Sequence, residues 1–167
     1  MKKVIVVLFV SLAFAASLFA IDGYTTVQGA YTYNNGKHYI GLASNSLGYG
    51  EGKSIGYYAG VDAAFNAKDI GEWNIGLLVG PSYRYAFGES GVVLNAALGV
   101  SGMGTPSYAA AGVGGYVGVD WKLNDSFGFA LGAKVGNDFL VVPFDGSGVH
   151  LENNFFVTPS LGVSFFY

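Results

Sequence analysis

The chain has 167 residues, of which 51% are hydrophobic, 16% aromatic and only 11% charged, and it contains no cysteine. Average soluble domains carry about 25% charged residues, so this composition is unusual for a soluble domain. The formal net charge is −3, becomes −5 without Lys2 and Lys3, and comes with no basic cluster. These features argue against a nucleic-acid partner, and the lack of cysteine excludes disulfides and thiolate metal sites.

Segment 1–20 has the pattern of a secretory signal peptide. Two lysines at positions 2 and 3 precede an apolar run, Val4–Phe14, and small residues follow it. This order is typical of an exported protein. We predict cleavage after Ala20, with Ala15 as the alternative, leaving one domain over residues 21–167. A membrane anchor is the other interpretation, but the run is marginal beside the ~20 residues of a spanning helix.

Glycine, asparagine and aspartate clusters divide the remaining chain into strand-sized segments. We predict strands at roughly 24–33, 38–47, 54–66, 73–87, 91–101, 109–123, 126–142 and 149–167. Most reach the ~9–11 residues with which a strand crosses a membrane. An apolar chain without spanning helices can cross a lipid bilayer only as a closed barrel, in which every backbone N–H and C=O group is paired. The sequence therefore predicts an all-β fold, an eight-stranded antiparallel transmembrane β-barrel with up-and-down order and periplasmic termini.

The alternation of side chains predicts which face meets lipid. One phase is large and apolar and the other is glycine-rich, small or polar in 54–66, 73–87, 109–123, 126–142 and 149–167. The segments 24–33 and 38–47 fit less well. The glycine-rich phase lacks the volume for a soluble core, whereas an eight-stranded barrel has an interior just wide enough for side chains. We therefore expect the apolar phase to face lipid.

The chain end carries a more specific signal. Ser160, Gly162, Phe165 and Tyr167 form the pattern polar-x-Gly-x-x-aromatic-x-aromatic. This resembles the outer-membrane β-signal, which in that family is read by the barrel-assembly machinery. In size and layout the domain is similar to small barrels of the OmpA-transmembrane, OmpX and OmpW kind. The resemblance implies a place in the cell outer membrane, with outer-membrane lipids and the assembly machinery as partners.

Four charged residues fall in the predicted lumen-facing phase: Asp62, Arg84, Asp120 and Lys134. Charges inside a narrow barrel need partners, because unpaired burial is costly. The balanced set predicts an internal ion-pair network that plugs the lumen. The alternative is a charged constriction that selects a small solute.

The last two predicted strands look too long for the membrane alone, so we expect their hairpin to project outside the cell. Leu140, Val141, Val142 and Phe144 make its tip apolar. Three roles remain open for this tip. It packs on other loops or lipid headgroups, it recruits a partner strand of a surface protein, or, as the OmpW resemblance suggests, it gates small hydrophobic molecules.

Catalysis has little support in the sequence. The two histidines, His38 and His150, form no His-x-Ser pair, so the chain departs from the lipid A deacylase pattern. We expect no enzyme activity and no cofactor. The predicted function is a structural or surface-interaction barrel with a plugged polar lumen. The alternative is passive uptake of small hydrophobic molecules, and a lipid-modifying enzyme ranks third.

Overall fold

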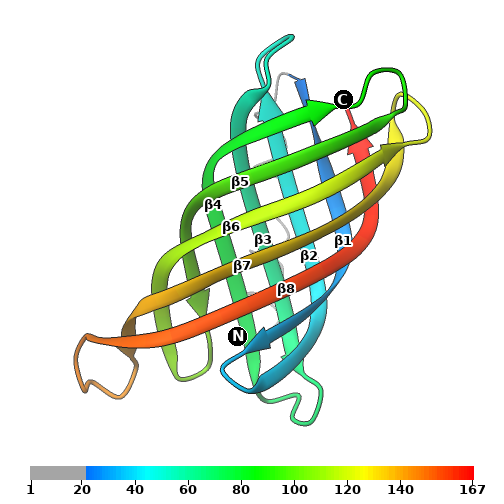
Figure 1. The fold of residues 1–167 in the computed structure, drawn as a ribbon. Helices are drawn as coiled ribbons and strands as arrows, with labels where there is room; N and C mark the ends of the chain where they lie inside the picture. The colour runs from blue at the N-terminus through cyan, green and yellow to red at the C-terminus, as the bar shows by residue number, and fades with distance from the viewer. Residues whose placement is uncertain (1–21) are drawn as a thin grey trace.

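The computed structural model describes residues 22–167, which form a closed barrel of eight antiparallel strands in sequence order (Figure 1). The strands are β1 (Asp22–Asn34), β2 (Lys37–Tyr49), β3 (Ile55–Asn66), β4 (Trp73–Ala86), β5 (Val92–Gly104), β6 (Tyr108–Lys122), β7 (Phe127–Pro143) and β8 (His150–Phe166). The predicted barrel is confirmed, and each strand bound lies within three residues of its prediction. The predicted signal peptide lies outside the described residues.

The barrel has two different ends. Tyr24 of β1 pairs with Phe166 of β8, so both strands meet at one end, called here the terminal end. The opposite end, called the loop end, carries the β1–β2, β3–β4, β5–β6 and β7–β8 connections (Figure 1). The β1–β2 turn consists of Asn35 and Gly36, both with positive φ. A two-residue hairpin of this type needs positive φ at both positions, which explains this residue pair.

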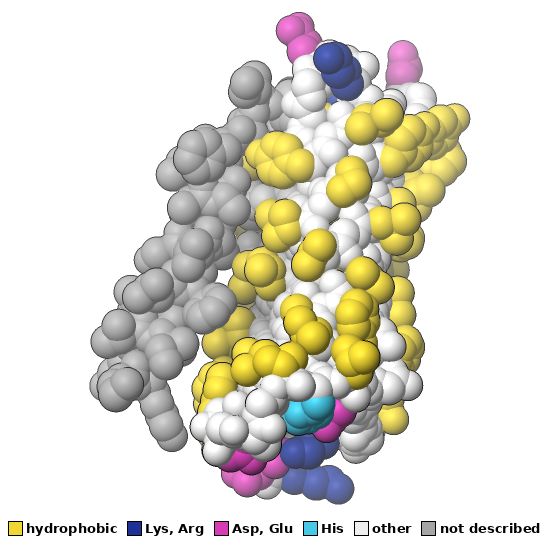
Figure 2. Space-filling model, turned by 90° about the vertical axis from the view of Figure 1, so that its left-hand side faces the viewer, with side chains coloured by type: hydrophobic (Ala, Val, Ile, Leu, Met, Phe, Trp, Pro, Cys, Tyr) yellow, Lys and Arg dark blue, Asp and Glu magenta, His cyan; other side chains and the backbone are white. Residues whose placement is uncertain are grey.

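The outer surface of the barrel is apolar across its middle. In β7, Phe129, Leu131 and Val135 are exposed, whereas Gly132 and Lys134 between them are buried. Figure 2 shows hydrophobic side chains covering the middle of one face, with charged side chains gathered at its two ends. This inside-out pattern is the one expected where strands cross lipid. Within residues 22–167, no helix is long and apolar enough to span a membrane.

The structure of β2 shows why its alternation of apolar and small side chains is weak. Its inner face carries Leu47 and Tyr49, both buried, and its outer face carries the small residues Ser46 and Gly48. The ring of Tyr57 lies over Gly48, where a Cβ atom would come within 2.3 Å of it. A neighbouring strand therefore supplies the apolar cover that β2 lacks.

Strand β7 contains an irregularity close to the loop end of the barrel. The pairing with β8 shifts between Asp138 and Leu140. Asp138 faces inward, Phe139 and Leu140 are both exposed, and Val141 is buried. A bulge of this kind re-aims the side chains that follow it, so it sets which residues the β7–β8 hairpin exposes.

Candidate functional site

Two tyrosine rings fill the centre of the barrel. Tyr58 of β3 and Tyr116 of β6 are fully buried and stack with ring centroids 4.8 Å apart. The Tyr58 hydroxyl donates to Asn45 Oδ1 at 2.6 Å. Inward glycines make room for these rings, since a Cβ atom at Gly132 would lie 2.6 Å from the Tyr116 hydroxyl. This stack was not predicted from the sequence, although each tyrosine stands among glycines of the small, inward phase.

Asp120 lies between this stack and the terminal end, and neutral donors surround it. It is fully buried and accepts hydrogen bonds from the Tyr24 hydroxyl at 2.8 Å and the Asn95 amide at 2.9 Å. The Ser164 hydroxyl donates to its other oxygen at 2.5 Å. Three strands therefore supply the donors that stabilise this buried carboxylate.

Arg84 lies at the mouth of the terminal end. Its Nε donates to the Lys53 carbonyl at 3.1 Å, and its guanidinium lies 4.5 Å from the centroid of the Tyr49 ring. The side chain is half-buried. This contact with an aromatic face is a cation–π interaction.

Lys134 and Asp62 form a buried ion pair in the half of the barrel nearer the loop end. Of the four predicted lumen charges, the structure thus brings these two together and gives Asp120 and Arg84 the different surroundings described above. A fifth lumen charge, Asp138, is hydrogen-bonded by the Ser101 hydroxyl. Asp138 was not among the predicted lumen charges, although the alternation that turns Lys134 inward also turns Asp138 inward.

The residues of the predicted assembly signal take ordinary places in β8 and at the chain end. The Ser160 hydroxyl donates to Gln28 Oε1 at 2.9 Å, and Phe165 packs edge-on against Phe127. A Cβ atom at Gly162 would lie 2.0 Å from the Val27 carbonyl oxygen, so β1 approaches β8 closely there. Tyr167 is exposed. The role of these residues in assembly stays a prediction.

The β7–β8 hairpin exposes most of its predicted apolar tip. Leu140, Val142 and Phe144 are exposed, but Val141 is only 2% exposed. Val141 must be removed from the predicted tip, because the shift in pairing between Asp138 and Leu140 turns its side chain inward. Two exposed apolar residues of the same hairpin, Val149 and Leu151, were not included in the prediction.

Part of the hairpin also has a free strand edge. β1 ends at Asn34, which pairs with Phe156, so no described strand pairs with residues 150–155 of β8 on that side. The Asn35 side-chain amide donates to the Asn153 carbonyl at 3.1 Å and to Asn154 Oδ1 at 2.5 Å. The edge is therefore capped at one point and otherwise open along the described chain.

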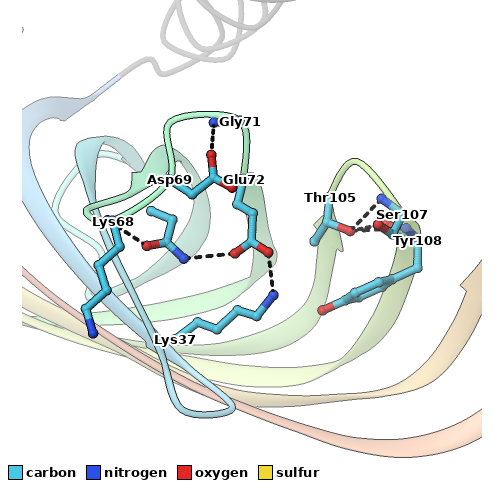
Figure 3. Close-up of polar contacts among 9 residues, drawn as sticks. Lys37, Lys68, Asp69, Gly71, Glu72, Thr105, Ser107 and Tyr108 are labelled. Atoms are coloured by element: carbon cyan, nitrogen blue, oxygen red, sulfur yellow. Dashed lines mark hydrogen bonds and ion pairs between the residues drawn. The ribbon is translucent and has the colours of Figure 1, made fainter.

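At the loop end, polar contacts order the β3–β4 and β5–β6 loops, and one ion pair joins β2 to the β3–β4 loop (Figure 3). Lys37 Nζ lies 2.9 Å from Glu72 Oε1, and the Asn66 amide donates to Glu72 Oε2 at 2.8 Å. These two donors lower the pKa of Glu72 below its usual value. Thr105 similarly accepts the Tyr108 N–H within the β5–β6 loop. These polar groups are already bonded to one another. The exposed apolar side chains of the β7–β8 hairpin are therefore the better candidates for contact with a partner.

Several solved structures of other proteins are similar to this one. No protein family and no curated protein matches the sequence. Among solved structures, Neisserial surface protein A matches with a TM-score of 0.66 at 14% identity, covering 87% of this chain and 97% of its own. Ail of Yersinia pestis matches with 0.56 at 12% identity, and covers 87% and 97%. The outer-membrane protein AlkL matches with 0.54 at 13% identity, and covers 87% and 90%.

The fold is that of the small eight-stranded outer-membrane β-barrels. This confirms the resemblance drawn from the C-terminal pattern and from the strand layout. The predicted location in the cell outer membrane agrees with the location of these neighbours and with the apolar outer surface.

Proposed function

We propose that the protein is an integral outer-membrane barrel that acts at the cell surface through its β7–β8 hairpin and does not conduct solutes. The observation that carries this proposal is an apolar strip that continues along the hairpin past the end of β1. Phe139, Phe144 and Leu151 belong to this strip, and Leu151 is 76% exposed. Large exposed apolar patches on folded proteins mark interaction sites.

The free edge of β8 supports a partner in extended conformation. Residues 150–155 offer backbone donors and acceptors on the side that β1 leaves unpaired. An extended peptide can add itself to such an edge as a further strand. Leu151 and Phe155 point outward there and Asn154 points inward, so a partner strand would alternate between apolar and polar side chains.

The filled interior supports the absence of conduction. Tyr58 and Tyr116 stack across the centre, and Leu47 and Leu78 pack in the same buried cluster. An eight-stranded barrel leaves little space beyond such side chains. The names of two neighbours, a surface protein and an attachment invasion locus protein, agree with a role at the surface.

Charge argues against a polyanionic ligand. Ail has been solved with the heparin analogue sucrose octasulfate. In this chain, the described loop end carries the lysines Lys37 and Lys68 against the carboxylates of Asp69, Glu72, Asp145 and Glu152. An acidic rim repels a sulfated sugar, so we propose a polypeptide partner.

Attachment of expressing cells to a surface coated with a serum-protein film tests the proposal. We expect Phe144→Ser and Leu151→Ser each to reduce attachment severalfold, because they remove apolar contact area from the hairpin. Ile70→Ser is the matched control, since Ile70 is an exposed apolar residue of the β3–β4 loop. Equal attachment by all variants, at equal heat-modifiable barrel content, would contradict the proposal.

Uptake of small hydrophobic molecules is the second candidate, and the seam between β1 and β8 favours it. The ladder there lacks pairs at Tyr31 and Thr32, opposite Pro159 and Thr158. Proline has no N–H to donate, which accounts for the gap. A shallow groove of ≈ 400 Å³ lies on the outer face at this point, lined by Tyr31, Pro159 and Leu161 among others.

A liposome assay with purified, refolded protein distinguishes the two candidates. The surface role predicts no acceleration in the uptake of an apolar fluorescent solute. The uptake role predicts acceleration that falls when Pro159→Val restores a ladder donor at the seam. Acceleration by the wild type would contradict the non-conducting proposal.

A further inference from the structure

The groove on the outer wall of the barrel, called here the seam groove, lies where β1 meets β8 and is separate from the β7–β8 hairpin. Its space is ≈ 400 Å³. The side chains around it come from four strands and are mainly apolar, and they include Tyr31, Ile40, Leu131, Pro159 and Leu161. Because these side chains are exposed, a molecule outside the barrel can reach all of them.

Gly29 leaves the space that makes this groove. Val27 and Tyr31 on either side of it are exposed on the outer face, so position 29 also points outward. A Cβ atom at Gly29 would meet only the Leu161 carbonyl oxygen, at 3.8 Å. Many inward glycines, by contrast, are crowded by buried rings or by a neighbouring backbone. No described neighbour therefore requires a glycine at this position, and its small size leaves an unfilled hollow on the surface.

The place of the groove decides the chemistry of its occupant. It belongs to the apolar outer surface that meets the bilayer, and Ile40, Leu131 and Leu161 are each more than half exposed around it. An acyl chain is the group that this surface meets. Lipid tails are as apolar as the wall, so apolar contact by itself does not hold one lipid in preference to another. A selective site needs a polar contact as well.

His38 offers that polar contact at the loop-end side of the groove. The hydroxyl of Tyr31, which lines the groove, shares a hydrogen bond with His38 Nδ1. Tyr33 lies opposite His38 in the β1–β2 ladder, with ring centroids 5.6 Å apart. These two contacts hold the imidazole on the outer face, and within residues 22–167 nothing bonds its Nε2 atom. When Tyr31 donates to Nδ1, the neutral imidazole carries its proton on Nε2 and can donate it outward.

The height of this group matches a lipid headgroup. His38 is the second residue of β2, next to the loop end, and rings with polar tips are typical of the level where strands leave the bilayer. Lys37 and Glu72 beside it form an ion pair and so balance each other's charge. We propose that the seam groove and His38 bind one phosphorylated acyl lipid. One acyl chain lies over Gly29, and a phosphate oxygen accepts the N–H of His38 Nε2.

Native mass spectrometry of the barrel in detergent, after incubation with lipids in equal amounts, tests the proposal. The probes are phosphatidylglycerol, lipid A and diacylglycerol, which has acyl chains but no phosphate. We expect the wild type to retain one phosphorylated lipid in preference to diacylglycerol. Whether phosphatidylglycerol or lipid A is preferred identifies the source of the ligand. Retention of diacylglycerol to the same extent, or of no lipid, would overturn the proposal.

Gly29→Leu tests the place of the acyl chain. It fills the groove, and the open space over Gly29 lets the barrel fold, which heat-modifiable migration checks. We expect lipid retention to fall severalfold. Gly102→Leu is the matched control, since Gly102 also lies on the outer face, on β5, and an added Cβ there would meet only the Ala110 carbonyl oxygen, at 3.6 Å. An equal fall in both variants, or in neither, would overturn the proposal.

His38→Phe tests the headgroup contact independently of the groove. It keeps a ring at the same place and removes the donor, so the variant should still retain lipid but lose the preference for phosphorylated lipids over diacylglycerol. His150→Phe, at the other histidine of the loop end, is the matched control and should keep that preference. A preference that persists in His38→Phe would overturn the role of His38 and with it the proposed site.

Discussion

Lys134 on β7 and Asp62 on β3 form an ion pair across the interior of the barrel, between strands that are not neighbours in the sheet. Both side chains are almost completely buried. Gly76 makes this possible, because a Cβ atom there would lie 2.7 Å from the Asp62 carboxylate. The pair thus joins opposite walls of the barrel and leaves neither charge without a partner.

Breaking only one side of this pair should be costly. We expect Lys134→Met to lower the free energy of unfolding by about 3 to 5 kcal/mol, because it leaves the Asp62 carboxylate buried without compensation. The double variant Lys134→Met, Asp62→Leu should recover most of that loss. Urea titration of the barrel in detergent measures both variants. A double variant no more stable than the single one would show that the pair does not act as a unit.

The tyrosine stack should close the barrel. We expect wild-type protein to give no steady conductance in planar bilayers, and the double variant Tyr58→Ala, Tyr116→Ala to give measurable single-channel steps, because two rings leave the centre. Tyr83→Ala, on the outer face of β4, is the matched control and should stay silent. Large steady steps in the wild type would refute the closed interior.

The outward positions were predictable because the pleat of a strand imposes a two-residue period. Phe129 and Leu131 follow that period without interruption. The pattern fails locally in β2, where Leu47 and Tyr49 point inward and the ring of Tyr57 covers the outer face. The apolar cover of β2 comes from a side chain of the next strand, so the sequence of β2 alone could not predict it.

The inward charges were predictable as a set, but their partners were not. Alternation turns Asp62, Lys134 and Asp120 inward, yet which of them meet depends on the stagger between strands far apart in the sequence. The structure places Lys134 against Asp62, whereas Asp120 receives Tyr24 and its other neutral donors. A balance of charges in the sequence therefore did not identify the actual contacts.

The contact between Lys37 and Glu72 should depend on pH in a defined direction. The donors Lys37 and Asn66 lower the pKa of Glu72. A lowered pKa in the folded state means that this contribution to stability is present above the ordinary pKa of glutamate and is lost as the pH falls through the folded-state value. The loss of this contribution to stability therefore occurs at acidic pH, and the contribution does not change around neutral pH.

Lys37→Gln tests this dependence. NMR titration should show the pKa of Glu72 moving back toward its ordinary value in the variant. Asp145 is an internal control, because its pKa is lowered by the backbone and hydroxyl groups of Ser147 in a different loop. A shift of equal size at Asp145, or none at Glu72, would contradict the assignment.

The inward glycines should be required by the side chains that lie over them. A Cβ atom at Gly132 would come within 2.6 Å of the Tyr116 hydroxyl and 2.7 Å of its ring. We therefore expect Gly132→Ala to destabilise the barrel by about 1 to 3 kcal/mol, the usual cost of overpacking an interior. Gly104→Ala is the matched control, because no atom lies within 4 Å of its added Cβ.

The second-site variant Tyr116→Leu separates overpacking from backbone effects. Combined with Gly132→Ala, it should restore part of the lost stability, because the shorter side chain withdraws the clashing ring. If the glycine were needed only for backbone freedom, the alanine would remain equally costly beside leucine. Urea unfolding of the two single variants and the double variant gives the interaction free energy directly. A value near zero would mean that the glycine and the tyrosine do not depend on one another.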